Sequence, residues 1–240
     1  MFGLEERLTI AITGYGQSDP NYSRKKVVKI TEGNSLDNFW IGIFPQSVYD
    51  YKILRKNSFP ANVKSISYRL PRDTIRPNPK ETKETLEKIY KDILKTIKSL
   101  NIPSSNLNVI GTSLGGVVAL RLANNIPLNK AVFVCPGADL SRCIRDGIAT
   151  SPIFKEGLKQ GYNFDYFKKE LKEFNPVDNM NHLSKKTRIL IHLGRWDKMI
   201  PFKEGLEIVS AFKKQGITPE VVKRNFYGHG FTILTFKNNQ

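Results

Sequence analysis

Short runs of branched apolar residues recur along this chain, and the later runs alternate with longer segments whose apolar residues have helical spacing. A repeated order of strand and helix predicts an α/β fold, because each helix brings the chain back to start the next strand in the same direction. Such a sheet is mainly parallel and is covered by helices on both faces. About eight strands are predicted, from the runs LTIAI, VVKI, FWIGIF, VKSISY, LNVI, KAVFVC, TRILIHLG and EVVKRNF.

Two helices stand out in this pattern. From about Pro79 to Leu100, apolar residues recur three and four positions apart, while lysines and acidic residues occupy the other face. Asn78 precedes this segment as an N-cap, and Pro79 and Glu81 suit its first turn. The segment LGGVVALRLANN predicts a buried helix directly after Ser113. The runs LTIAI and VVKI have no helix between them, so we expect them to form an antiparallel edge.

The length of 240 residues suits a single domain, and we expect residues 1–240 to form it. From about 141 to 180 the alternation weakens, and a polar segment containing aromatic residues predicts a small helical cap inserted into the domain. Its apolar side chains either line a substrate pocket or pack the insert against the sheet. These side chains are Ile153, Phe154, Tyr162, Phe164, Tyr166 and Phe167.

The formal net charge is +16, from 38 Lys and Arg against 22 Asp and Glu. This excess would attract polyanions, anionic lipid surfaces or acidic substrates. The lysines are scattered along helical faces, and no basic cluster alternates with aromatic residues, which favours an ordinary solvated surface over a nucleic-acid platform. We therefore expect no specific nucleic-acid partner.

Cysteine content and apolar run lengths bear on the compartment of the protein. Cys135 and Cys143 are too few for a disulfide framework and lack a histidine at metal-ligand spacing, so we interpret both as free thiols. The N-terminus lacks the order of a secretory signal. No apolar run reaches the roughly 18 to 20 residues that cross a bilayer. We expect a cytoplasmic protein without a transmembrane segment.

A Gly-x-Ser-x-Gly motif spans Gly111 to Gly115 and lies between a predicted strand and a predicted helix. This is the setting of a nucleophile elbow, in which a serine takes a strained turn that lifts its hydroxyl above the strand end. The small flanking residues let the backbone pass closely. The alternative is a turn that needs small residues for structural reasons only.

A serine hydroxyl needs a base to become a nucleophile, and the chain contains three histidines. His192 lies inside a predicted strand and suits a packing role, and His182 lies in a polar stretch. His229, in the loop YGHGF, is the candidate base. The candidate acid that would orient it is Asp197, in HLGRWDKMIP after a predicted strand, with Asp139 in CPGADL as the alternative.

Ser113, Asp197 and His229 follow one another in the order nucleophile, acid, histidine, and with this order the chain resembles an α/β-hydrolase of the esterase and serine-peptidase type. The resemblance extends from about Phe39 to the C-terminus. It implies an oxyanion hole with one donor at the N–H of Leu114, after the nucleophile. The second donor in this family follows the third strand, often at a His-Gly pair. Here the loop reads IGIFPQSVYDY, and since Pro45 has no N–H, Gln46 or Ser47 would supply it, with Gln46 at the matching position.

The resemblance implies a serine hydrolase that cleaves small carboxylic esters through an acyl-enzyme, without a metal or an organic cofactor. Thioester hydrolysis, peptide hydrolysis and acyl transfer use the same apparatus and remain alternatives. A hydrolase-like binding protein without activity is the alternative from a different class. The expected partner is a small-molecule ester substrate.

Overall fold

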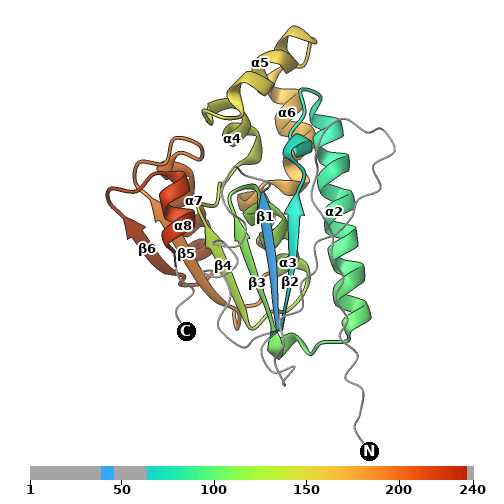
Figure 1. The fold of residues 1–240 in the computed structure, drawn as a ribbon, viewed down its shortest axis with the longest axis vertical. Coiled ribbons are helices and arrows are strands. Elements are labelled where there is room, and N and C mark those ends of the chain that lie inside the picture. Colours follow the sequence, from blue (N-terminus) through green and yellow to red (C-terminus); the bar gives the residue numbers. More distant parts are fainter. Residues whose placement is uncertain (1–38, 46–63, 237–240) are drawn as a thin grey trace, which may run out of the picture.

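The computed structural model describes residues 39–45 and 64–236 of the chain. Six strands within these residues form one sheet in the order β2-β1-β3-β4-β5-β6, and each neighbouring pair is parallel (Figure 1). The strands are β1 (Phe39–Pro45), β2 (Lys64–Leu70), β3 (Leu107–Thr112), β4 (Lys130–Val134), β5 (Arg188–Gly194) and β6 (Glu220–Arg224).

The α-helices that connect and cover the strands are α2 (Pro79–Leu100), α3 (Leu114–Asn125), α4 (Leu140–Asp146), α5 (Ser151–Lys159), α6 (Phe164–Leu171), α7 (Phe202–Lys214) and α8 (His229–Thr235). Short 3₁₀ turns occupy Arg72–Thr74, Ser104–Asn106, Lys172–Phe174 and Pro176–Asp178. The predicted α/β fold with a mainly parallel sheet is confirmed. Six of the eight predicted strands are found, and the first two, LTIAI and VVKI, lie outside the described residues.

The predicted helices at 79–100 and after Ser113 are found as α2 and α3. The N-cap of α2 is Asn78, whose side chain accepts a hydrogen bond from the N–H of Lys80 at 3.0 Å. This contact satisfies one of the free N–H groups at the start of a helix. The helix ends at Leu100, and its C-cap Asn101 has left-handed backbone angles and donates its N–H to the carbonyl of Lys98.

The two faces of the sheet carry separate apolar clusters, because successive strand residues point to opposite faces. One face packs against α2, α3 and α7, with Ile41, Val109, Phe133 and Ile191 among the strand residues. The other face carries Trp40, Ile110, Val132 and Leu190, and among the described helices α8 covers it with Ile233. Burial on both faces explains why the central strands read as continuous apolar runs.

The expected insert contains α4, α5 and α6, which lie at the top of Figure 1, above the carboxyl ends of the strands. Phe154 and Phe167 are buried, and their rings meet edge to face at 5.1 Å between centroids. Phe164 also contacts Phe154, and Tyr162 stacks on Tyr166. Packing is therefore the role of Phe154 and Phe167, as the second of the two interpretations expected.

The order of the strands locates the position at which a site can form. The chain passes from β1 to β2 on one side, and then continues on the other side of β1 with β3. In open parallel sheets a crevice opens outside the carboxyl ends of the strands at such a reversal. Ser113 directly follows β3, the strand beside β1 at this point.

Candidate active site

Ser113 occupies the sharp turn between β3 and α3. Its backbone angles are φ 53° and ψ −126°, a conformation that residues with a side chain rarely adopt. The turn is fixed on both sides. The N–H of Ser113 donates to the carbonyl of Val134 at 2.8 Å, and its own carbonyl accepts from the N–H of Gly116 at 2.8 Å. The side chain is partly exposed, while the preceding residues of β3 are buried.

Two glycines make this turn possible, because α3 packs directly on the backbone of the sheet. A Cβ atom at Gly115 would lie 2.1 Å from the carbonyl oxygen of Ile43 in β1. A Cβ atom at Gly111 would lie 2.6 Å from the Cβ of Ala119 in α3. These distances are far below van der Waals contact, so both motif glycines are required by packing, whatever the chemistry of the serine.

Asp197 and His229 lie in contact, and both side chains are buried. Oδ2 of Asp197 and Nδ1 of His229 are 2.7 Å apart. The other carboxylate oxygen, Oδ1, accepts the N–H groups of Met199 at 2.9 Å and Ile200 at 2.8 Å. Three contacts thus hold the carboxylate in one orientation, and that carboxylate holds the imidazole ring. This leaves Nε2 as the nitrogen that can exchange a proton with a substrate or a hydroxyl.

The loops that carry this pair are tied together by their backbones. The N–H of Arg195, just after β5, donates to the carbonyl of Arg224 at 2.9 Å, and the N–H of Trp196 donates to that of Tyr227 at 3.1 Å. Gly194, the last residue of β5, must lack a side chain for the loops to approach this closely, since a Cβ atom there would lie 2.7 Å from the carbonyl oxygen of Tyr227. The acid loop and the histidine loop therefore form one unit.

The alternatives weighed from the sequence lie in other surroundings. Asp139 is the N-cap of α4, where it accepts the N–H of Arg142 at 3.1 Å and the hydroxyl of Ser141. His192 is buried in β5 against the ring of Phe236, and burial lowers its pKa to about 4. His182 is exposed. The structure thus pairs His229 with Asp197, and Asp139 serves the start of a helix.

Cys135 is the residue of this site whose position the sequence analysis missed. It directly follows β4, is 2% exposed and has a left-handed φ of 51°. Its Sγ lies 4.0 Å from the carbonyl oxygen of His229, and its N–H donates to the carbonyl of His192 at 2.8 Å. Burial raises the pKa of the Cys135 thiol, and the nearby Asp197 carboxylate raises it further. The thiol is therefore protonated near neutral pH and is a poor nucleophile.

Cys135 also links the two halves of the site. The N–H of Ser113 donates a hydrogen bond to the carbonyl of Val134, the residue before Cys135. The Sγ of Cys135 in turn contacts the backbone carbonyl of His229. Ser113, Asp197 and His229 thus follow β3, β5 and β6 and lie beyond the carboxyl ends of these parallel strands, with Cys135 after β4 between them. The sequence placed each of them after a strand, and parallel pairing brings such positions together.

The thiol, carboxylate and imidazole of Cys135, Asp197 and His229 have ligand atoms within 4.8 Å of one another, so they are also a candidate metal group. Ligand atoms around a tetrahedral zinc ion lie roughly 3.3 to 3.7 Å apart, given bond lengths of about 2.0 to 2.3 Å. The 2.7 Å between Asp197 and His229 is instead the length of a charge-assisted hydrogen bond. The arrangement fits a hydrogen-bonded carboxylate and imidazole better than a metal centre.

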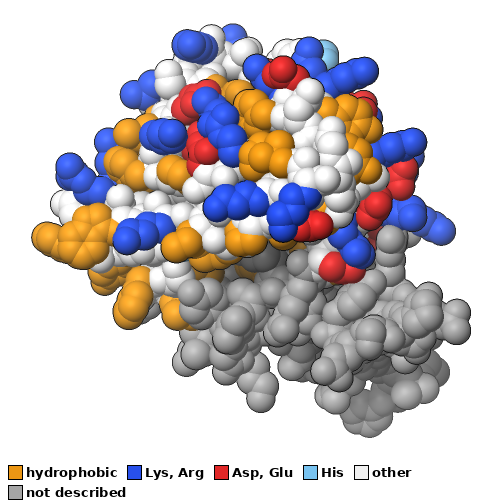
Figure 2. All heavy atoms as spheres, turned by 90° about the horizontal axis from the view of Figure 1, so that it is seen from above, with side chains coloured by type: hydrophobic (Ala, Val, Ile, Leu, Met, Phe, Trp, Pro, Cys, Tyr) orange, Lys and Arg blue, Asp and Glu red, His pale blue; other side chains and the backbone are white. Residues whose placement is uncertain are grey.

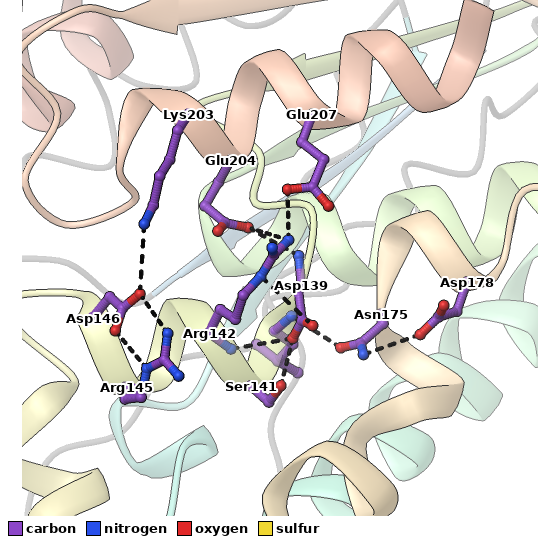
Figure 3. A network of polar contacts seen from close by, with 11 residues as sticks. Asp139, Ser141, Arg142, Arg145, Asp146, Asn175, Asp178, Lys203, Glu204 and Glu207 are labelled. Atoms are coloured by element: carbon purple, nitrogen blue, oxygen red, sulfur yellow. Dashed lines mark hydrogen bonds and ion pairs between the residues drawn. The ribbon is translucent and has the colours of Figure 1, made fainter. Parts of the chain in front are cut away.

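A partly buried polar network fixes the start of α7, the helix that follows the loop of Asp197 (Figure 3). Glu204 is 1% exposed, accepts the N–H of Asp139 at 3.2 Å and pairs with the guanidinium of Arg142 at 3.3 Å. Arg142 also pairs with Glu207 at 2.7 Å. Burial raises the pKa of Glu204. The network joins α4 of the insert to α7, so both are held relative to the loop of Asp197.

Of the two expected oxyanion donors, the structure describes the one at Leu114. Leu114 is the first residue of α3, and the N–H groups of a first helical turn have no partner inside their helix. They carry the positive end of the helix dipole, which favours a developing negative charge. Gln46 and Ser47 lie outside the described residues, so the second donor stays a prediction.

The parallel sheet, the strand order and the elbow after β3 define a protein of the α/β-hydrolase class. Within that class, the sequence model of the prolyl oligopeptidase family matches residues 81–239, and the chain belongs to this family. No curated protein sequence matches the chain. In the part of the chain that the structure describes, no helix has the length and apolar character needed to cross a membrane.

Solved structures share the fold at low sequence identity. An acetyl xylan esterase from Paenibacillus sp. R4 has a TM-score of 0.62 and 14% identity, over 85% of this chain and 72% of that one. The capsule O-acetyltransferase of Neisseria meningitidis serogroup A has a TM-score of 0.61 and 18% identity, over 90% and 92%. A puromycin-hydrolyzing peptidase of Mycobacterium tuberculosis has a TM-score of 0.61 and 13% identity over 84% of this chain, which spans 32% of that peptidase.

Proposed function

We propose that this protein hydrolyses small carboxylic esters, with Ser113 as nucleophile, His229 as general base and Asp197 as the acid that orients the histidine. Membership of the prolyl oligopeptidase family and the fold support a serine hydrolase. The observation that carries the proposal is the buried contact of 2.7 Å between Asp197 and His229, at the same sheet edge as the strained turn of Ser113.

In the proposed reaction, Nε2 of His229 takes the proton of the Ser113 hydroxyl as its oxygen attacks the ester carbonyl carbon. The N–H of Leu114 and, as predicted, that of Gln46 stabilise the oxyanion. The imidazolium then gives its proton to the leaving alcohol, and the C–O bond breaks. A water molecule, deprotonated by His229, attacks the acyl-enzyme. The imidazolium returns this proton to Oγ of Ser113 as the bond between that oxygen and the acyl carbon breaks, which releases the carboxylic acid and restores the serine. Asp197 stabilises the imidazolium in both halves of the cycle.

Acyl transfer to an alcohol is the second candidate function. The fold similarity to the capsule O-acetyltransferase, over 90% of this chain and 92% of that protein, is the observation that favours it. Hydrolysis and transfer share the acyl-enzyme and differ only in whether water or an alcohol attacks it. Added alcohol acceptors would divert the acyl group from hydrolysis if transfer is the function.

The test begins with a fluorophosphonate probe, which labels an activated serine. We expect labelling of the folded wild type at Ser113 and none of Ser113→Ala. A series of p-nitrophenyl esters from acetate to octanoate, beside a thioester and an aminoacyl amide, then ranks the substrates by kcat/KM. We expect the acetyl and butyryl esters to rank first. Folded wild-type protein that the probe does not label would contradict the enzyme proposal, and a higher kcat/KM for the amide would reassign it to a peptidase.

A further inference from the structure

Four large apolar side chains are exposed at the end of the molecule that carries the acid and histidine loops. Trp196, Phe226, Phe231 and Ile148 are 60%, 75%, 67% and 64% exposed, and we call them the aromatic patch. Figure 2 looks down on the carboxyl ends of the strands and shows hydrophobic side chains standing out at the left, where Figure 1 places β6 and α8. Exposed apolar groups gathered in one place mark an interaction surface.

Contacts between the loops hold the patch together. The rings of Trp196 and Phe226 meet edge to face, 5.6 Å apart at 88°. Tyr227, next to Phe226, contacts the ring of Phe231 at 6.1 Å. Ile148, two residues after the end of α4, is tied to the loop of Trp196 by its backbone, because its N–H donates to the carbonyl of Lys198 at 3.1 Å. The side chains are thus presented together by a backbone that is itself hydrogen-bonded.

The charges around the patch are basic. Arg195, Lys198 and Lys223 are exposed beside it, and the guanidinium of Arg224 lies over the ring of Tyr227. In Figure 2, Lys and Arg side chains lie next to the hydrophobic group at the left. The loop after β5 and the strand β6 each contain one acidic residue, and neither offsets the positive charge at the patch. Asp197 is buried against His229, and Glu220 begins β6 at its opposite end.

In the described part of the chain, the acid that precedes Ile148 on α4 is already paired. Asp146 bonds to Arg145 at 2.6 Å and lies 3.9 Å from Lys203 (Figure 3). Within residues 39–45 and 64–236, the patch therefore presents apolar side chains beside positive charge that no neighbouring acid offsets. This arrangement disfavours a second copy of the chain as the partner, because a two-fold contact would place like charges together.

We propose that the aromatic patch docks the protein on an anionic lipid bilayer. Phe226, Phe231 and Ile148 have no polar side-chain atom, so a hydrogen-bonding partner gains nothing from them, whereas the acyl region of a bilayer does. Tryptophan prefers the boundary between headgroups and acyl chains. Arginine and lysine beside it reach the headgroup phosphates of anionic lipids. The net charge of +16 draws the protein to such a surface from a distance.

Docking would bring the candidate active site to the bilayer. Trp196 directly precedes Asp197, and Phe231 follows His229 by two residues. Short-chain acyl esters of amphiphilic alcohols, which concentrate at this boundary, are then the substrate class that meets the site. This last step rests on the proposed function, whereas the docking itself does not.

The chain contains its own reporter of docking. Of its two tryptophans, Trp40 is fully buried and Trp196 is exposed, so a change in fluorescence on binding reports the patch. We expect vesicles of phosphatidylcholine and phosphatidylglycerol, mixed equally, to shift the emission to the blue, and brominated acyl chains to quench it. Binding measured by co-sedimentation should be at least tenfold weaker on phosphatidylcholine alone, and should weaken again in 0.5 M salt.

Variants separate the patch from general stickiness. The double variant Phe226→Ser with Phe231→Ser should lower vesicle affinity at least tenfold while circular dichroism shows a folded protein, because both side chains are largely exposed. The matched control is Leu158→Ser, which removes an exposed apolar residue of α5 outside the patch and should leave affinity unchanged. Lys223→Glu should lower binding to the anionic vesicles.

Three outcomes would overturn the proposal. They are no binding to anionic vesicles, an equal loss in Leu158→Ser, and binding to soluble polygalacturonate without binding to vesicles, which would reassign the patch to an acidic polysaccharide. Ser113→Ala keeps this test apart from the proposed function. It should bind vesicles like the wild type while it has no esterase activity, so docking and catalysis can fail independently.

Discussion

Ser113 and Cys135 occupy matching positions at the ends of neighbouring strands, yet only Ser113 has the surroundings that the proposed nucleophile needs. Both have a left-handed φ, 53° and 51°. Each donates its N–H to the carbonyl of the next strand at 2.8 Å, Ser113 to Val134 and Cys135 to His192. Thiolates are intrinsically better nucleophiles than serine hydroxyls, so the choice between the two positions must come from their surroundings.

Three differences decide against the cysteine. Ser113 is partly exposed, whereas Cys135 is buried and its thiol has a raised pKa. Ser113 is followed by Leu114 at the start of α3, with an N–H and a helix dipole available for an oxyanion. Cys135 is followed by Pro136, which has no N–H. A strained turn alone therefore does not make a nucleophile, because the residue after it must also supply a donor.

The comparison of Ser113 with Cys135 predicts its largest difference in kcat. Ser113→Ala should lower kcat for p-nitrophenyl acetate by about 10⁵-fold, because the members of a triad act as a unit. Cys135→Ala should keep kcat within about threefold, since its thiol is protonated and enclosed. Steady-state kinetics on both variants, with circular dichroism to verify folding, make the measurement. A greater loss in Cys135→Ala than in Ser113→Ala would exchange the roles given to the two residues.

The next effect concerns the acid. Asp197→Asn should lower kcat/KM by about 10³- to 10⁴-fold, because an amide cannot stabilise the imidazolium and favours the wrong tautomer of His229. Asp139→Asn is the matched control on the neighbouring loop, where asparagine still serves as an N-cap, so we expect less than a threefold change. A larger loss for Asp139→Asn would assign the acid to the residue after β4.

Much of the candidate site can be predicted from the sequence. A Gly-x-Ser-x-Gly motif between a strand and a helix predicts the elbow, and the position after a strand predicts that Asp197 and His229 reach the same edge. For Cys135 the sequence predicts only a free thiol, because its contact with His229 depends on how loops from three strands converge. Nothing in one segment of sequence encodes that convergence. The structure describes neither Gln46 nor the first two predicted strands, which stay predictions.

The aromatic patch and the packing of the insert could not be predicted from the sequence for a similar reason. Trp196 and Phe226 lie 30 positions apart on different loops, and their basic neighbours are far apart in the sequence, whereas parallel pairing of β5 and β6 brings these segments together. The apolar residues of the insert fitted a pocket lining as well as a core, because hydrophobicity alone does not distinguish the two. Ring contacts between Phe154 and Phe167 decide for packing.

A smaller effect tests how the elbow is supported. Gly115→Ala should lower the free energy of unfolding by about 3 kcal/mol, because the added Cβ would overlap the carbonyl of Ile43. Gly116→Ala is the matched control in the same turn. Its Cβ would lie 3.7 Å from the nearest atom, so the higher helix propensity of alanine should stabilise the protein by about 0.5 kcal/mol. Urea denaturation measures both, and equal losses would contradict the close packing of α3 on β1.

The smallest effect bears on the strain that Ser113 and Cys135 share. Ser113→Gly and Ser113→Ala both remove the hydroxyl, but only glycine adopts φ 53° and ψ −126° without a steric cost. We expect the glycine variant to be more stable than the alanine variant by about 1 kcal/mol, after subtraction of the entropy that glycine adds to the unfolded chain. The same comparison at Cys135, with φ 51°, should have the same sign.

Thermal and urea unfolding of the four variants measure this difference directly. If Ser113→Ala were the more stable of its pair, the turn would be relaxed, and the position of the serine would not require strain. If the glycine gain were found at Ser113 and not at Cys135, the strain would belong to the nucleophile position alone. A gain at both positions would show that the sheet edge imposes the turn, and that exposure and the following residue then decide which side chain reacts.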